Sequence, residues 1–200
     1  ASDVYKRQIE DPVEYTLEGV NQVQLREDIG LTFTAALRTF LRQDPDIVML
    51  GEIRDADTAQ MAIRSALTGH LIFSTIHTNS AWGCVSRLTD MGVHPYLLAD
   101  TLVLCVAQRL VRLLCPHCKV SRNDRNGFRA VGCDACYDTG YAGRKAIYEV
   151  LPVDERLSSA IRRAEEVVIQ PERMGIRTLR TSALELVEQG LTSYEEAVSY

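Results

Sequence analysis

Two short apolar runs, separated by a stretch with helical spacing, place the strongest constraint on how this chain folds. The first run is Ile47–Leu50, and the second is the mostly apolar segment 71–76. Between them, the apolar residues of segment 58–67 recur with the period of an amphipathic helix. A strand, a helix and a strand of these lengths form a parallel crossover unit, so the sequence predicts an α/β fold with a parallel sheet.

A polar residue follows each of these two expected strands. Glu52 comes almost directly after the first strand, and His77 follows the second. Because ligands bind outside the carboxyl ends of the strands in open α/β sheets, we expect Glu52 and His77 to face one site. A carboxylate in this position is what a nucleoside triphosphatase uses to hold Mg²⁺ and its waters. The alternative interpretation of Glu52 is a carboxylate that caps a helix or lies on the surface.

Spacing and capping residues predict the other elements. Residues 32–43 have one apolar face, and Asp55 or Asp57 can cap the helix that follows the first strand. We expect that helix to pack through its apolar residues Met61, Ile63, Ala66 and Leu67. Further strands are expected at 106–114 and 145–150, and further helices at 81–91, 95–104, 154–163 and 178–188. The chain is therefore expected to contain an α/β part followed by a mostly helical tail.

Four of the six cysteines form two Cys-x-x-Cys pairs. Cys115 and Cys118 make the first pair, Cys133 and Cys136 the second, and 14 residues separate the pairs. This spacing is typical of four-thiolate zinc sites, in which the closed tetrahedral shell leaves no open position for catalysis. We therefore predict a structural zinc site, with redox chemistry at one pair as the alternative. The two other cysteines, Cys84 and Cys105, are expected to be ordinary core residues.

Charge and hydropathy argue against two further classes of protein. The net charge of −5 and the isoelectric point near 5.4 do not favour broad electrostatic binding to nucleic acid. Aromatic residues make up only 6% of the chain, which gives few platforms on which bases could stack. No stretch approaches the roughly 20 apolar residues that a membrane-spanning helix needs. We expect neither a nucleic-acid partner nor a transmembrane segment.

Several motifs in a fixed order resemble those of the secretion ATPases that power type II secretion and type IV pilus assembly. Residues 9–14 resemble the aspartate box of that family, and residues 42–55 resemble its Walker B region. Residues 68–79 resemble its histidine box, and the cysteine pairs together with residues 139–144 resemble its zinc element. The resemblance extends from about Ile9 to about Ala197.

This resemblance implies a partial RecA-like P-loop NTPase core with a zinc-binding module and a helical tail. It implies ATP, Mg²⁺ and zinc as cofactors, and a homohexamer as the assembly. The expected partners are an inner-membrane platform and cytoplasmic adaptor proteins, and the expected location is the cytoplasm, peripheral to the inner membrane. Pilus retraction motors of the family lack the four cysteines, so the cysteines favour a secretion or assembly motor.

The resemblance also assigns roles to individual residues. Glu10 is expected to polarise the attacking water, Glu52 to act through Mg²⁺, and His77 to contact the γ-phosphate. From the residues alone, a turn is the favoured interpretation of Glu10, because Glu-Asp-Pro is also common loop chemistry.

Three further residues are assigned to cofactor binding: Asp11, Arg54 and Arg87. Each arginine offers the cation that a nucleotide phosphate needs. The alternative for both arginines is a solvated position on the surface.

We expect residues 1–8 to be a foreign or truncated leader, because they are polar and no apolar strand precedes Ile9. The expected divisions are then an ATPase core at 9–114, a zinc module at 115–136 and a strand with helices at 137–200. No Gly-x-x-x-x-Gly-Lys-Ser/Thr loop occurs in these 200 residues, and the resemblance implies that it precedes residue 9. We therefore expect this part of the ATPase alone to be inactive. The alternative function is a zinc-stabilised interaction module without catalysis.

Overall fold

The computed structural model describes residues 4–122, 127–163 and 175–199, and these residues form two compact units. Within them, the first unit comprises 4–78, 83–103 and 153–163, and the second comprises 79–82, 104–152 and 175–199. The long segment of the second unit thus begins at residue 104, whereas the expected ATPase core extends to residue 114. None of the helices in the described part of the chain is long and apolar enough to cross a lipid bilayer.

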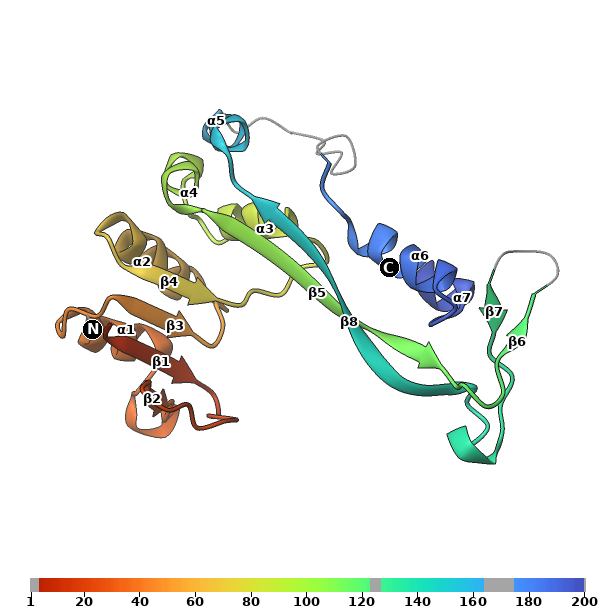
Figure 1. Ribbon diagram of the computed structural model, residues 1–200. Coiled ribbons are helices and arrows are strands. Elements are labelled where there is room, and N and C mark those ends of the chain that lie inside the picture. Colours follow the sequence, from red (N-terminus) through yellow and green to blue (C-terminus); the bar gives the residue numbers. More distant parts are fainter. Residues whose placement is uncertain (1–3, 123–126, 164–174, 200) are drawn as a thin grey trace. The chain divides into compact units, whose positions relative to one another are not determined.

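The first unit contains a four-stranded parallel sheet in the order β2-β1-β3-β4 (Figure 1). Its strands are β1 (Lys6–Glu10), β2 (Asn21–Gln24), β3 (Ile47–Leu50) and β4 (Leu71–Ser74). Strands β3 and β4 are joined through α2 (Ala56–Leu67), which is the crossover unit that the apolar spacing predicts. The predicted α/β class is confirmed.

Strand β1 lies inside the sheet, between β2 and β3, and it includes residues that the sequence assigned to a leader. Gln8 and Ile9 are buried, so residues 6–8 are part of the sheet although they do not form an apolar strand. The strand was not predicted because three of its five residues, Lys6, Arg7 and Gln8, are polar and precede Ile9. The guanidinium of Arg7 lies 5.8 Å from the ring centres of both Tyr5 and Phe40, so a long polar side chain is covered by aromatic surface.

Strand β4 has one strand partner, β3, among the described residues, although the sequence predicts it as a buried strand. Leu71 and Phe73 are 48% and 52% exposed. Apolar runs predict strands through their composition, but the composition does not say which strand is at the edge of the sheet.

Helix α1 (Phe33–Leu41) is capped by Thr32, and α2 is capped by Asp55, one of the two caps that the sequence indicates. The Thr32 hydroxyl accepts the N–H of Ala35, and the Asp55 carboxylate accepts the N–H of Thr58. A short 3-10 helix, Glu27–Ile29, precedes α1. Of the predicted packing face of α2, Ile63 is buried, Met61 and Ala66 are half-buried, and Leu67 is 45% exposed. The helix buries mainly small residues: Thr58, Ala59, Ala62, Ile63 and Ser65.

Three more helices complete the described part of the first unit: α3 (Gly83–Asp90), α4 (Pro95–Thr101) and α5 (Glu155–Arg162). Helix α5 packs on α4, and the Ser158 hydroxyl donates to the carbonyl of Ala99 at 2.7 Å. The Arg162 guanidinium pairs with Asp100. Residues 153–163 therefore belong to the first unit, although the sequence grouped them with the tail.

The second unit is built on an antiparallel ribbon of two long strands, β5 (Leu104–Leu114) and β8 (Tyr141–Pro152) (Figure 1). Helices α6 (Leu179–Glu188) and α7 (Tyr194–Ala197) pack against this ribbon. The segment between the two strands carries the hairpin β6 (Val120–Ser121) and β7 (Phe128–Arg129) and the 3-10 helix Asp134–Cys136. All four cysteines of the two pairs lie in this segment.

Candidate functional site

The carboxyl ends of β1, β3 and β4 meet at one edge of the parallel sheet. The N–H of Gly51 donates to the carbonyl of Ile9 at 2.7 Å, and the Thr75 hydroxyl donates to the carbonyl of Gly51 at 2.6 Å. A Cβ atom on Gly51 would lie 3.0 Å from the Ile9 carbonyl oxygen and 3.3 Å from the Cα of Glu10. Gly51 therefore lets the residues after β3 lie close to the end of β1. Sequence reasoning missed both Gly51 and Thr75.

Glu52 and His77 meet at this edge, as the sequence predicts. The Nε2 atom of His77 lies 3.3 Å from Oε2 of Glu52, and the guanidinium of Arg54 pairs with Oε1. The Glu52 side chain is 18% exposed, whereas the His77 ring is 91% exposed. The carboxylate is thus held from two sides, and the imidazole is open to a ligand.

The ionisation of Glu52 is set mainly by its neighbour Arg54. The hydrogen bond from Arg54 holds the pKa of Glu52 below its ordinary value, burial opposes this shift, and the charges of Arg54 and His77 add to it. Glu52 in turn raises the pKa of Arg54. Glu52 is consequently a carboxylate across the neutral pH range, the form that accepts hydrogen bonds from metal-bound waters.

Of the adjacent acidic residues Glu10 and Asp11, Asp11 belongs to this cluster and Glu10 lies beside it. Oδ2 of Asp11 lies 3.7 Å from the Arg54 guanidinium, so Arg54 lies between two carboxylates. Glu10 ends β1, and its Oε2 accepts the amide of Gln22 at a long 3.5 Å. The edge therefore presents three acidic residues, one arginine and one histidine within a short stretch of surface. Such a set can bind a hydrated divalent cation and a phosphate group together.

Arg87 lies apart from this cluster in the contacts that the structure describes. It is an exposed residue of α3, and within the described residues no ion pair or hydrogen bond joins it to Glu52 or His77. His70, which the sequence does not assign to the site, lies just after the end of α2. Its Nδ1 atom is 3.1 Å from the carbonyl oxygen of Ser65 in that helix.

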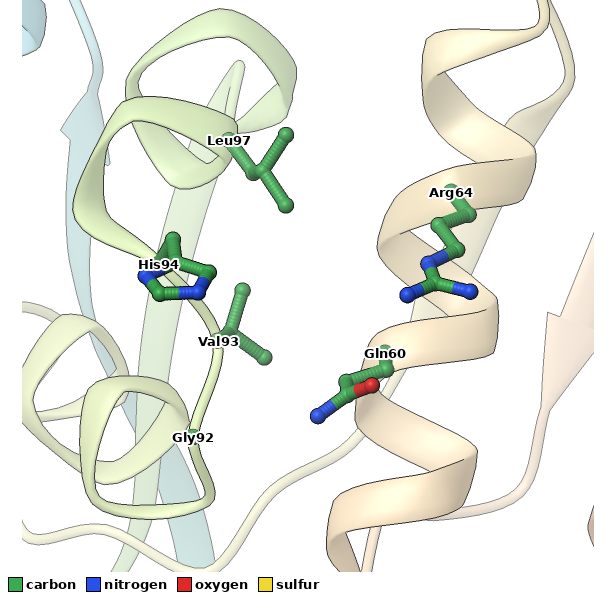
Figure 2. A pocket seen from close by; sticks show the side chains of 6 residues that line it. All are labelled: Gln60, Arg64, Gly92, Val93, His94 and Leu97. Atoms are coloured by element: carbon green, nitrogen blue, oxygen red, sulfur yellow. The ribbon is translucent and has the colours of Figure 1, made fainter.

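A cavity of about 90 Å³ lies elsewhere in the first unit, between α2 and the start of α4 (Figure 2). Arg64 and Gln60 extend into it from α2, and His94 and Leu97 line its other side. None of the sequence-predicted site residues lines this cavity. A nucleotide is far larger than 90 Å³, so the open acidic edge is the better candidate site.

The four paired cysteines form a second candidate site, in the second unit. Their sulfur atoms all lie within 4.8 Å of one another, with 4.0 Å between Cys115 and Cys133 and 3.8 Å between Cys118 and Cys136. A tetrahedron with Zn–S bonds of about 2.3 Å separates its sulfurs by about 3.8 Å. A disulfide needs a sulfur–sulfur distance of about 2 Å, so these cysteines are thiols. The residues fit a tetrahedral zinc ion.

Backbone N–H groups lower the pKa of one thiol of the cluster, that of Cys136. Burial opposes ionisation of the Cys136 thiol, but the N–H groups of Gly140 and Cys133 donate to its sulfur and lower its pKa to about 7. Burial, together with the neighbouring thiols, raises the pKa of Cys133 to about 12. A bound cation would favour the thiolate form of all four residues, as zinc does in closed thiolate sites.

Contacts tie this cysteine module to the helices that follow it. The Lys119 ammonium donates to the carbonyl of Gly190 at 2.8 Å, and the hydroxyls of Tyr141 and Ser193 lie 2.8 Å apart. The buried Glu196 accepts the Arg112 guanidinium at 2.6 Å. The module and the helices α6 and α7 therefore form one packed body.

We expect Gly140→Ala to destabilise this body by about 1–3 kcal/mol more than Gly143→Ala does. Both glycines have left-handed backbones, with φ of 75° and 83°, so both substitutions carry the same conformational cost. Only at Gly140 would the new Cβ collide, at 2.6 Å from the Cβ of Ala130, whereas at Gly143 the nearest atom is 3.9 Å away. Urea unfolding of both variants with zinc present measures the difference, and equal midpoints would contradict the expected collision.

Comparison with known proteins gives this chain a family. The model of the type II/IV secretion system protein family matches residues 3–199. The type II secretion system protein HxcR of Pseudomonas aeruginosa is 48% identical over 191 residues, which cover 94% of this chain and 40% of that protein. The type IV pilus assembly ATPase PilB of Myxococcus xanthus is 47% identical over 210 residues, which cover 94% and 37%. The chain thus spans about two fifths of the length of these relatives.

Solved structures agree with the family assignment. The pilus retraction motor PilT with bound ADP has a TM-score of 0.74 and 30% identity, over 98% of this chain and 52% of that one. The Legionella pneumophila ATPase DotB has a TM-score of 0.72 over 99% of this chain and 51% of that one. Its 22% identity shows the common fold alone.

Proposed function

Because this chain belongs to the type II/IV secretion system protein family, we propose that it forms the carboxyl-terminal part of a hexameric ATPase. ATP hydrolysis by the whole protein powers type II secretion or type IV pilus assembly, the two machines in which its relatives are named. The observation that most supports this proposal is the cluster of Glu52, Arg54 and His77 at the carboxyl edge of a parallel sheet.

Each residue of the acidic edge then has a distinct task. Glu52, a carboxylate at neutral pH, binds the waters of Mg²⁺, which supplies charge neutralisation on the phosphates when it is bound. Glu10 orients the attacking water. The exposed imidazole of His77 donates a hydrogen bond to the terminal phosphate.

Arg54 and Asp11 bind the nucleotide in this proposal. In the ligand-free chain Arg54 pairs with two carboxylates, so contact with a phosphate requires it to leave at least one of them. Arg87, exposed on α3, is the third proposed cofactor-binding residue and would reach the nucleotide in the assembled protein.

The proposed setting is the cytoplasmic side of a bacterial inner membrane. There a homohexamer acts on an inner-membrane platform and on cytoplasmic adaptor proteins, as the family resemblance implies. The four cysteines bind zinc and hold the second unit in shape. ATP turnover by the full-length protein, measured with and without Mg²⁺, tests the central claim, and failure to hydrolyse ATP would refute it.

We expect residues 1–200 alone to bind ATP weakly and to hydrolyse none. They contain the acidic edge but no Gly-x-x-x-x-Gly-Lys-Ser/Thr loop, whose backbone N–H groups and lysine hold the phosphates. Titration of these residues with a fluorescent ATP analogue measures the affinity, and the full-length protein is the positive control. A micromolar dissociation constant for residues 1–200 would contradict this expectation.

The thiolate cluster favours one second candidate function, a zinc-stabilised interaction module without catalysis. This alternative explains the four cysteines, but it does not explain why Glu52 and His77 meet at the sheet edge. The coding sequence upstream separates the two functions. A glycine-rich loop with Lys-Ser or Lys-Thr shortly before residue 9 supports the ATPase.

A further inference from the structure

Glu149 is a buried carboxylate in an apolar strand. It lies in β8, on the same face as Ile147 and Leu151, and all three are buried. Its cross-strand neighbour in β5, Ala107, is buried as well. A carboxylate in such a position is costly unless it accepts hydrogen bonds, so its partner has a definite role in the fold.

That partner is the peptide N–H of Ala81, which donates to Oε1 of Glu149 at 2.9 Å. Ala81 is itself buried, and it belongs to the four residues 79–82 that group with the second unit. The chain on both sides of these four residues groups with the first unit. Glu149 therefore hydrogen-bonds to the short segment 79–82, which groups with the second unit.

This point lies just beyond the histidine of the candidate site. His77, whose imidazole is 3.3 Å from Glu52, precedes Ala81 by four residues along the chain. His77 has left the hydrogen-bonded ladder of β4, which ends at Ser74. The path of the backbone after the strand must then be fixed by contacts on either side, and a fixed backbone is what holds a catalytic imidazole in a usable position.

We propose that Glu149 is a positioning residue of the ATPase site: by accepting the Ala81 N–H, it fixes the segment that carries His77. This inference rests on the proposed ATPase function.

The test uses three variants of the full-length protein. In Glu149→Ala, the acceptor is lost, and we expect kcat for ATP hydrolysis to fall about 10- to 100-fold, while the dissociation constant for ATP stays close to that of the wild type. In Glu149→Gln, the amide oxygen still accepts the N–H, so most of the lost kcat should return. Ser182→Ala is the matched control, because it removes a side-chain hydrogen bond to the backbone of Tyr148 on the same strand, at 3.2 Å.

A second measurement does not depend on activity. Trp82 is the only tryptophan in these 200 residues, and it adjoins Ala81. With tryptophans elsewhere in the protein replaced by phenylalanine, Glu149→Ala should change the emission of Trp82 and its quenching by acrylamide, whereas Ser182→Ala should not.

Two results would overturn the inference. One is a wild-type kcat and an unchanged Trp82 emission in Glu149→Ala. The other is that Glu149→Ala and Ser182→Ala lose kcat equally, and that the loss of kcat in each variant is proportional to its loss of thermal stability. A wild-type protein that hydrolyses no ATP would instead refute the proposed function, and the Trp82 measurement would still decide whether Glu149 fixes residues 79–82.

Discussion

Glu52→Gln in the full-length protein is expected to lower kcat for ATP hydrolysis by at least about 100- to 1,000-fold while nucleotide binding persists. The substitution keeps the size of the side chain but removes the negative charge that lies between Arg54 and His77. In the proposed site, this charge acts on the waters of Mg²⁺, so its loss raises the barrier of the chemical step more than it weakens the ground-state complex. Single-turnover hydrolysis and equilibrium binding of a fluorescent ATP analogue separate the two effects.

The control for Glu52→Gln is Glu18→Gln. Glu18 is exposed and precedes the left-handed Gly19, and among the described residues it has no ion pair with Arg54 or His77, so its substitution should leave kcat unchanged. Glu10→Gln should also abolish turnover, because this carboxylate is proposed to orient the attacking water. A wild-type rate in either Glu52→Gln or Glu10→Gln would show that the role given to that residue is wrong.

Cys115→Ser is expected to release the bound metal and to unfold the body formed by the cysteine module, α6 and α7. The expected effect is large because structural zinc contributes about 10–16 kcal/mol of binding free energy to folding at neutral pH. Cys115 is fully buried at the end of the ribbon, and its N–H donates to the carbonyl of Gly140 at 2.9 Å, so the metal and the ribbon share this residue. Elemental analysis together with thermal unfolding measures both consequences.

The matched substitution for Cys115→Ser is Cys84→Ser, which removes a thiol that does not belong to the cluster. This variant should retain the metal and unfold near the wild-type temperature. The zinc assignment fails if the wild-type protein contains fewer than about half an equivalent of zinc per chain. It also fails if Cys115→Ser retains both the metal and the wild-type unfolding temperature.

The parts of the fold that sequence predicted are those with local signals. The crossover unit followed from two apolar runs and a helical period, and the meeting of Glu52 with His77 followed from the rule that parallel strands end at one edge. The cysteine cluster followed from spacing alone, because two Cys-x-x-Cys pairs at this separation are typical of four-thiolate sites.

The parts that sequence did not predict depend on contacts between distant segments. Strand β1 was not predicted because Lys6 and Arg7 are not typical residues of an inner strand. The aromatic rings beside Arg7 explain how that residue is accommodated. Helix α2 packs through small residues, which carry little hydrophobic signal. The hydrogen bond that Glu149 accepts from the N–H of Ala81 has no local signal in the sequence, because the two residues are 68 positions apart.

The residues that flank the long ribbon, Val103 before β5 and Val153 after β8, are hydrogen-bonded to each other. The N–H of Val153 donates to the carbonyl of Val103 at 2.9 Å. The chain thus departs from the first unit and comes back to it at adjacent positions. Insertions or deletions at the distant tip, around the cysteine hairpin, would leave α4 and α5 in register. Homologues can therefore differ in length at that tip at little cost to the packing of α5 on α4.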